Sequence, residues 1–219
     1  MSAGVLRVLI ADDHAVVRQG IRGVLEEVEG LEVVAEAADG NEALAMTEHH
    51  GPDVVVLDVT MPGKTGLEVA RELRDSGSPV RVLILSMHDD PEYVLEAVRA
   101  GADGYVLKDV APAELRAAVT AVHEGREYFS ARVTHQLSVG LREEIEREQR
   151  RSRLDSLTAR EVEVLVLVAQ CMTNREIEGQ LGISPRTVET HRERVMAKLR
   201  IRTVAGLTRF VVEQGLDIE

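Results

Sequence analysis

A strand-like run followed by an acid and a turn occupies residues 54–63, which read Val54-Val55-Val56-Leu57-Asp58-Val59-Thr60-Met61-Pro62-Gly63. An unbroken row of β-branched and leucine residues is typical of a strand that is buried on both faces of a parallel sheet. Pro62 and Gly63 then indicate a turn. We therefore expect Asp58 to lie at the carboxyl end of a central strand.

Similar apolar runs recur on both sides of this stretch. They cover residues 6–10, 31–34, 82–85 and 105–107. Apolar residues at helical spacing separate them, which predicts helices over 14–28, 40–50, 66–76, 91–100 and 112–124. Five strand–helix units in series predict an α/β domain with a doubly wound parallel sheet. We assume the flavodoxin-like order 2-1-3-4-5 for this sheet, one of the common doubly wound orders. We assign residues 1–127 to this domain.

The rest of the chain has a different pattern. Residues 128–153 are expected to be a linker, in which apolar residues recur every four positions at Val133, Leu137, Leu141 and Ile145. This spacing fits a linker helix with a narrow apolar stripe, and it fits a solvated tether of marginal helicity equally well.

Residues 154–219 are expected to form a four-helix domain, because helix-start signals follow one another closely. Thr158 with Glu161 makes a capping box, and Ser184 is followed by Pro185 at the first helical position. The predicted helices end near residues 170, 181, 199 and 213.

The net charge of −12 over 219 residues argues at first against a nucleic-acid binder, which usually has a basic excess. The charge is unevenly placed, however. Residues 1–130 carry −13, residues 131–153 carry +2 and residues 154–219 carry −1. The acidity thus belongs to the α/β domain, and nucleic-acid binding by the helical domain stays open.

Two further features indicate a soluble protein of the cytoplasm. The single cysteine, Cys171, excludes an internal disulfide and suits a reducing compartment. No apolar run approaches the ~18–20 residues of a membrane span, and the N-terminus lacks the layout of a signal peptide. We expect Cys171 to be a small, partly buried residue rather than a redox sensor.

Charged and polar residues follow four of the five predicted strands. Asp12 and Asp13 follow the first strand, Asp58 the third, Ser86 the fourth and Lys108 the fifth. Because the carboxyl ends of parallel strands meet at one edge, we expect these groups to lie together. Taken one at a time, these residues have ordinary structural interpretations: each acid as a helix cap, Ser86 as a turn residue and Lys108 as a solvated charge. Together, the carboxylates favour Mg²⁺ and a carboxylate nucleophile toward phosphoryl groups.

These residues resemble the receiver domain of bacterial response regulators, over roughly residues 5–125. The matching motifs are Asp12-Asp13, Asp58 with Met61-Pro62-Gly63, Ser86 and Gly104-Tyr105-Val106-Leu107-Lys108-Asp109. The resemblance implies that Asp58 accepts a phosphoryl group from a sensor histidine kinase. It also implies that Mg²⁺ is held by Asp12, Asp13, Asp58 and the backbone carbonyl of Thr60. Ser86 and Lys108 would grip the phosphoryl oxygens, and Tyr105 would be an aromatic switch.

Residues 173–181 and 184–199 read as a helix–turn–helix pair, an arrangement that also occurs in plain helical bundles. The motifs Leu157-Thr158-Ala159-Arg160-Glu161, Thr173-Asn174-Arg175-Glu176-Ile177 and Ser184-Pro185-Arg186-Thr187-Val188-Glu189-Thr190-His191-Arg192 resemble the LuxR-type DNA-binding domain. Together with a receiver, this is the architecture of the NarL/FixJ family of transcription regulators. The resemblance implies base contacts from Glu189, Thr190 and Glu193, phosphate contacts from Thr187, Arg192, Arg194 and Lys198, and an outward-pointing Arg186.

The expected function is therefore a two-component response regulator that binds double-stranded promoter DNA as a phosphorylation-dependent homodimer. RNA polymerase is a candidate partner, and no membrane partner is expected. We expect no enzymatic activity beyond Mg²⁺-dependent self-phosphorylation and slow autodephosphorylation. One alternative is a regulator that uses its receiver as an interaction module without phosphorylation. Another is a phosphohydrolase resembling haloacid dehalogenases, which requires a second Asp two residues after the nucleophile, where this chain has Thr60.

Overall fold

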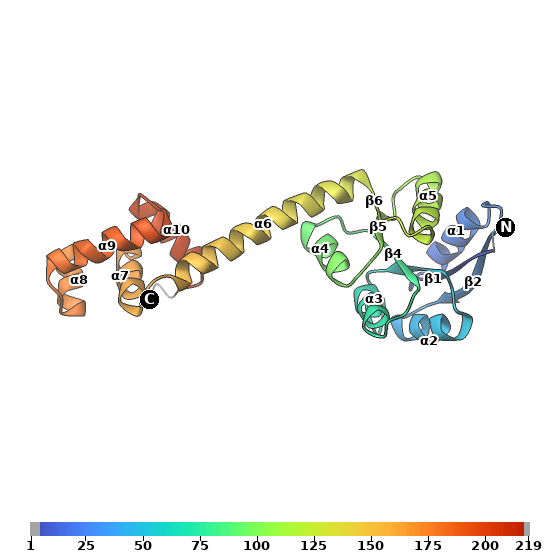
Figure 1. Ribbon diagram of the computed structural model, residues 1–219, viewed down its shortest axis with the longest axis horizontal. Helices are drawn as coiled ribbons and strands as arrows, with labels where there is room; N and C mark the ends of the chain where they lie inside the picture. The colour runs from blue at the N-terminus through green and yellow to red at the C-terminus, as the bar shows by residue number, and fades with distance from the viewer. Residues whose placement is uncertain (1–4, 217–219) are drawn as a thin grey trace. The chain divides into compact units, whose positions relative to one another are not determined.

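The computed structural model describes residues 5–216, which divide into two compact units after Arg142 (Figure 1). The first unit contains the whole sheet, and the second unit is helical. Within the described residues, no helix combines the length and the apolar character that a membrane crossing requires. The domain bounds expected from the sequence remain predictions.

The sheet of the first unit has six parallel strands in the order β2-β1-β3-β4-β5-β6. They are β1 (Leu6–Ala11), β2 (Leu31–Ala37), β3 (Val54–Asp58), β4 (Arg81–Ser86), β5 (Gly104–Leu107) and β6 (Tyr128–Phe129). The predicted order of the first five strands is confirmed. The sequence did not predict β6, because a strand of two residues is too short to show a period.

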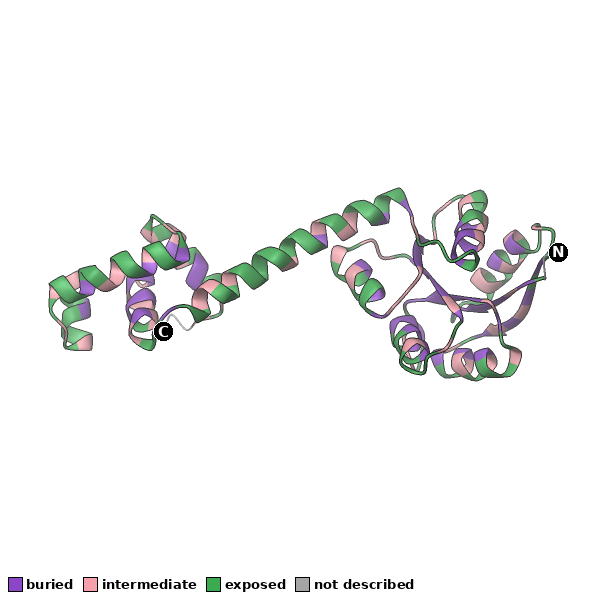
Figure 2. Cartoon of the chain, in the orientation of Figure 1, coloured by how far each residue is buried: buried purple, intermediate pink, exposed green. Residues whose placement is uncertain are grey.

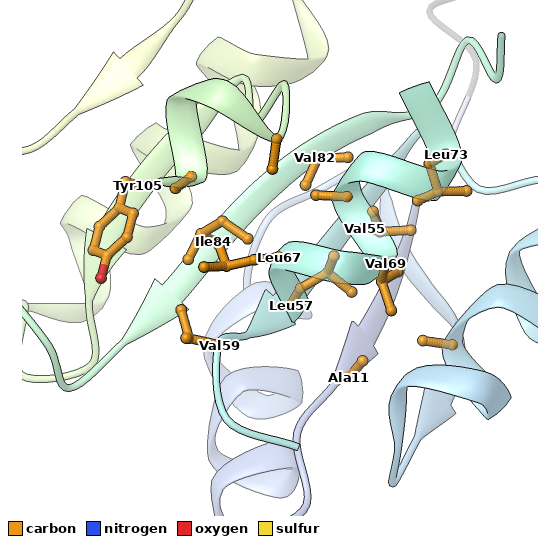
Figure 3. Packing of buried hydrophobic residues seen from close by; sticks show 14 of the residues in the cluster. Ala11, Val55, Leu57, Val59, Leu67, Val69, Leu73, Val82, Ile84 and Tyr105 are labelled. Carbon is orange, nitrogen blue, oxygen red and sulfur yellow. The ribbon is translucent and has the colours of Figure 1, made fainter. Parts of the chain in front are cut away.

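Helices cover both faces of this sheet, because the side chains of each strand alternate between two apolar layers. They are α1 (Ala15–Leu25), α2 (Gly40–His50), α3 (Gly66–Asp75), α4 (Pro91–Arg99) and α5 (Pro112–His123). On one face, Val8, Val56 and Leu83 pack with α1 and α5. On the other, Leu57 and Ile84 pack with α3 and α4. Figure 3 shows both residues beside Leu67 of α3, and Figure 2 shows that buried residues are concentrated in the strands.

Residues 131–155 form one helix, α6 (Ala131–Asp155), and its apolar stripe is buried only at the start. Val133 is completely buried in the core of the first unit, and Leu137 packs against that core. Leu141 and Ile145 are 45% and 53% exposed. Gly140 lies where α6 meets α4, because a β-carbon at this position would come within 2.6 Å of Leu95. The first turns of α6 are thus part of the first unit.

The second unit contains the remaining helices around its own core. They are α7 (Ala159–Ala169), α8 (Asn174–Leu181), α9 (Pro185–Leu199) and α10 (Val204–Glu213). The predicted starts at Thr158 and Ser184 are confirmed, since each side chain accepts a backbone N–H as a helix cap. Thr173 and Thr203 cap α8 and α10 in the same way. Val164, Leu165, Ile177, Val195 and Leu207 form the centre of this core.

The side chain of Cys171 differs from its prediction. It is exposed, and its backbone has a positive φ of 63° directly after the last turn of α7. In this position it ends α7 as glycine commonly does, with its N–H bonded to the carbonyl of Val168.

Candidate functional site: an acidic phosphoacceptor pocket and a helix–turn–helix pair

The acidic residues gather at the carboxyl edge of the sheet, as the sequence predicts. Asp12 follows β1 and Asp58 ends β3, the neighbouring strand, and both are buried. Lys108, directly after β5, places its Nζ 2.7 Å from Asp12 Oδ2 and 2.8 Å from Asp58 Oδ2. One ammonium group therefore bridges the carboxylates of two strands.

Local contacts fix the orientation of Asp12. Its Oδ1 accepts the backbone N–H of His14 at 2.8 Å, and Arg18 Nη1 donates to its backbone carbonyl at 2.6 Å. Its buried Oδ2 has no hydrogen bond of good geometry, so Lys108 satisfies it by ionic contact alone. A buried carboxylate oxygen with an open coordination direction is suited to a metal ligand.

The ligand atoms of Asp12, Asp13, His14 and Asp58 all lie within 4.8 Å of one another. Asp13 is partly exposed, and its Oδ1 lies 2.6 Å from Nδ1 of His14. Oxygen-rich sites of this kind fit a hard divalent cation such as Mg²⁺. Sequence reasoning missed His14, although its position directly after the two acids was a usable signal.

The site shifts the pKa values of its central pair. Burial raises the pKa of Asp58, and hydrogen bonding to Lys108 and to the Thr60 backbone only partly opposes this. Burial pulls the pKa of Lys108 down, but its close contacts with the carboxylates of Asp12 and Asp58 together outweigh burial and raise it overall. Lys108 therefore keeps its proton and its charge beside the carboxylates.

A glycine allows the start of α3 to lie directly against the backbone of Asp58. Gly66 begins α3, and a β-carbon there would lie 2.1 Å from the backbone oxygen of Asp58. Thr65 caps α3 in a reciprocal capping box with Glu68. Met61 is buried and Thr60 is exposed, so the loop between Asp58 and α3 presents Thr60 to the outside. Any residue with a β-carbon at position 66 would push the start of α3 away from the backbone of Asp58.

Ser86 and Tyr105 are fully buried beside the acidic pocket and are linked to each other. The Tyr105 hydroxyl donates to the carbonyl of His88 at 2.6 Å, and Ser86 Oγ accepts the N–H of the same residue at 3.0 Å. Burial raises the pKa of Tyr105 to about 12, against the lowering effect of its hydrogen bond with Ser86. The ring packs inward as part of the apolar layer (Figure 3). The backbone of His88 thus connects the two side chains.

The helix–turn–helix pair consists of α8, a short turn and α9. Gly182 ends α8 in the left-handed conformation, and Ser184 caps α9 with Pro185 at its first position. Val188, Val195 and Leu199 bury the inner side of α9. The predicted outward side is exposed at Arg186, Thr187, Glu189, Thr190, Glu193 and Arg194.

Lys198 and Arg192 differ from these six residues, because both are engaged within the unit. Lys198 Nζ pairs with the buried Glu161 at 2.7 Å and donates to the carbonyl of Ser156 at 3.0 Å. Arg192 is partly buried, and its Nη1 donates to Asn174 Oδ1 at 2.8 Å. The structure therefore gives Lys198 a part in joining α9 to the start of α7. Sequence reasoning missed this pairing, since Glu161 reads locally as only a capping residue.

Comparison with known proteins assigns both units. Residues 8–120 match the family described as response regulator receiver domain, and residues 155–211 match bacterial regulatory proteins of the luxR family. The chain is 35% identical over 211 residues to the response regulator UvrY of Escherichia coli strain K12, covering 96% of this chain and 95% of UvrY.

Two solved structures are similar over nearly the whole chain. The response regulator ChrA of a heme-sensing two-component system is 36% identical, with a TM-score of 0.57, and covers 98% of this chain and 100% of that one. A structure of two RcsB dimers bound to two parallel DNAs is 26% identical, with a TM-score of 0.56, and covers 94% of this chain and 98% of that one.

Proposed function

We propose that this chain is switched when a sensor histidine kinase transfers a phosphoryl group to Asp58. It belongs to the response regulators that have a receiver and a LuxR-type DNA-binding domain. The chain is a two-component response regulator, and its relatives are regulators of the same architecture. The observation that carries the proposal is the Lys108 ammonium between Asp12 and Asp58.

The acidic pocket fits Mg²⁺. Asp12, Asp13, Asp58 and the carbonyl of Thr60 would hold the ion, with Asp12 acting through water. When bound, Mg²⁺ offsets the negative charge of the carboxylates and of the incoming phosphoryl group. The support for this assignment is the oxygen-rich donor set and the buried Asp12 Oδ2, which makes no hydrogen bond.

The transfer itself needs few groups from the chain. An Asp58 carboxylate oxygen attacks the phosphorus of phosphohistidine, the P–N bond breaks, and the imidazole leaves and takes up a proton from solvent. An acyl phosphate on Asp58 results. Lys108 stays charged and stabilises the phosphoryl oxygens, and Ser86 donates a hydrogen bond to one of them. Slow hydrolysis of the acyl phosphate returns the chain to its first state.

Ser86 also supplies a route from the phosphoryl group to the switch. Drawing the Ser86 hydroxyl toward a new dianion breaks its hydrogen bond with the N–H of His88, the residue whose carbonyl holds the Tyr105 hydroxyl. The Tyr105 ring is packed in the apolar layer. A packed core accommodates such a change between two discrete arrangements. We propose that this change releases the receiver's inhibition of the effector and allows the chain to form a dimer.

Promoter DNA is the target of the dimer in this proposal. Glu189, Thr190 and Glu193 would contact bases, while Thr187, Arg192, Arg194 and Lys198 would contact phosphates, with Arg186 beside them. The exposure of most of these side chains on one helix supports the assignment. RNA polymerase is a candidate partner on the promoter, and we propose that the protein acts in the cytoplasm, where bacterial promoter DNA lies.

Incubation with a small phosphodonor and Mg²⁺ tests the central step. We expect a mass gain of one phosphoryl group in the wild-type chain and none in Asp58→Asn. A gain that persists in Asp58→Asn, or no gain in either protein, would leave the interaction-module alternative in place. The phosphohydrolase alternative requires turnover of an external phosphate ester, and Thr60 lacks the carboxyl group that would shuttle its proton.

A further inference from the structure

Three polar side chains form a hydrogen-bonded chain across the helix–turn–helix pair. Nδ2 of Asn174, in the first turn of α8, donates to Oε2 of Glu189 on α9. Oδ1 of Asn174 accepts from Nη1 of Arg192 at 2.8 Å. Glu189 is exposed, whereas Asn174 and Arg192 are partly buried. Asn174 therefore connects two of the side chains that we propose as DNA contacts.

The chemistry of its two partners fixes the orientation of the Asn174 amide. A guanidinium only donates hydrogen bonds, and an ionised carboxylate only accepts them. The reverse orientation would set the amide nitrogen against Arg192 and the amide oxygen against Glu189. An aspartate here would satisfy Arg192 but repel Glu189, and an alanine would serve neither. Position 174 therefore needs one donor and one acceptor at the same time.

Glu189 and Arg192 have a competing arrangement that Asn174 prevents. They are three residues apart on α9, a spacing at which side chains of opposite charge meet on a helix surface. A direct pair would draw the Glu189 carboxylate along the helix and occupy both of its oxygens with the guanidinium. Asn174 instead holds Oε2 and leaves Oε1 available to an outside donor.

We propose that Asn174 is a positioning residue for base recognition, which holds Glu189 so that its free oxygen accepts a hydrogen bond from the N4 amino group of cytosine. The inference rests on the proposed function, DNA binding through α9. Cytosine N4 is a donor in the major groove, and carboxylates are its usual acceptors. A carboxylate that is already oriented loses less side-chain freedom on binding than a free one.

Selection from a randomised duplex library with the full-length, phosphodonor-treated chain provides the test. The selected duplex is then varied to all four base pairs at each position, and binding is compared for wild type, Asn174→Asp, Glu189→Ala and the exposed control Gln180→Ala. We expect one C·G position at which Glu189→Ala and Asn174→Asp each lose roughly tenfold in preference. Gln180→Ala should keep the wild-type profile, and circular dichroism should show equal helix content in all four proteins.

A double variant separates positioning from a general effect on the fold or on charge. In the Glu189→Ala background, Asn174→Asp should cause no further loss at that position. A loss that persists there, or an unchanged preference in Asn174→Asp, would overturn the inference. Failure of the wild-type chain to select any duplex would instead contradict the proposed function, so the two failures are distinguishable.

Discussion

The ammonium nitrogen of Lys108 lies 2.8 Å from Oδ2 of Asp58, whose carboxylate we propose to be phosphorylated. Lys108 belongs to the loop after β5 and Asp58 to the end of β3, so the contact reaches across β4. The same ammonium lies beside Asp12, which makes Lys108 the shared counter-ion of both buried carboxylates. The first prediction follows from this arrangement.

Replacing Lys108 by methionine should make the stability of the chain depend on Mg²⁺. Removing one partner of a fully buried ion pair costs about 3–5 kcal/mol, and we expect about 2–3 kcal/mol here because the Lys108 side chain is 12% exposed. Added Mg²⁺ should recover much of this loss by neutralising Asp12 and Asp58. Thermal unfolding of both proteins with and without Mg²⁺ measures it. Equal Mg²⁺ gains in wild type and Lys108→Met would contradict the shared counter-ion role.

The Glu161–Lys198 pair should give the second unit an acid-sensitive stability. Hydrogen bonds from Lys198 and from the Thr158 backbone lower the pKa of Glu161 below its ordinary value of 4.5. A lowered native pKa stabilises the fold above the unfolded pKa, and this contribution is lost as the pH falls through the native pKa. Urea unfolding of wild type and Glu161→Gln should therefore differ most at neutral pH and converge below pH 4.5. A difference that is constant with pH would rule out this linkage.

Two cations of α9, Arg194 and Lys198, should behave differently when truncated. Arg194 is exposed, so Arg194→Ala should leave stability unchanged and reduce the salt slope of DNA binding by about 1. Lys198→Ala leaves the buried Glu161 unpaired and should lower the free energy of unfolding by about 2 kcal/mol, since the lysine itself is partly exposed. Salt titrations of binding and urea unfolding measure both effects. Equal stability losses would remove the structural assignment of Lys198.

Two glycines inside helices should respond in opposite directions to alanine. A β-carbon at Gly179, in α8, would meet nothing within 4 Å, so Gly179→Ala should stabilise by about 0.5–1 kcal/mol through helix propensity. At Gly140 it would lie 2.6 Å from Leu95 and 3.1 Å from Pro91. We expect Gly140→Ala to lose about 1 kcal/mol net, because overpacking outweighs propensity. A clear gain in melting temperature for Gly140→Ala would show that α6 and α4 are not in close contact.

Cysteine at position 171 has a backbone cost that glycine avoids. Its φ of 63° lies in the left-handed region, which disfavours side chains that have a β-carbon. Cys171→Gly should therefore raise the free energy of unfolding by about 0.5–1 kcal/mol. Arg200, with φ of 58° at the end of α9, is the matched position, and Arg200→Gly should give a similar gain. Calorimetry of the two variants checks this, and a loss in both would contradict it.

Local patterns in the sequence determined the elements and their order. Apolar runs and helical spacings predicted five strands that alternate with five helices, because burial of strands on both faces and of helices on one face leaves a period in the sequence. Caps such as Ser184 and Thr158 predicted where helices begin, because capping needs only residues a few positions apart. The gathering of Asp12, Asp58 and Lys108 followed from the shared edge of parallel strands.

The tertiary structure alone decided which partners the charged side chains have. The sequence indicates only a phosphate contact for Lys198, and the packing of α9 against α7 adds a partner within the unit, Glu161, 37 positions away. Asn174 acquired its part in holding Glu189 only through the crossing of α8 and α9. β6 and the buried start of α6 likewise depend on a sheet edge and a helix face that exist only after folding. Ion pairs and hydrogen bonds between distant residues have no period, so a single sequence carries no signal for them.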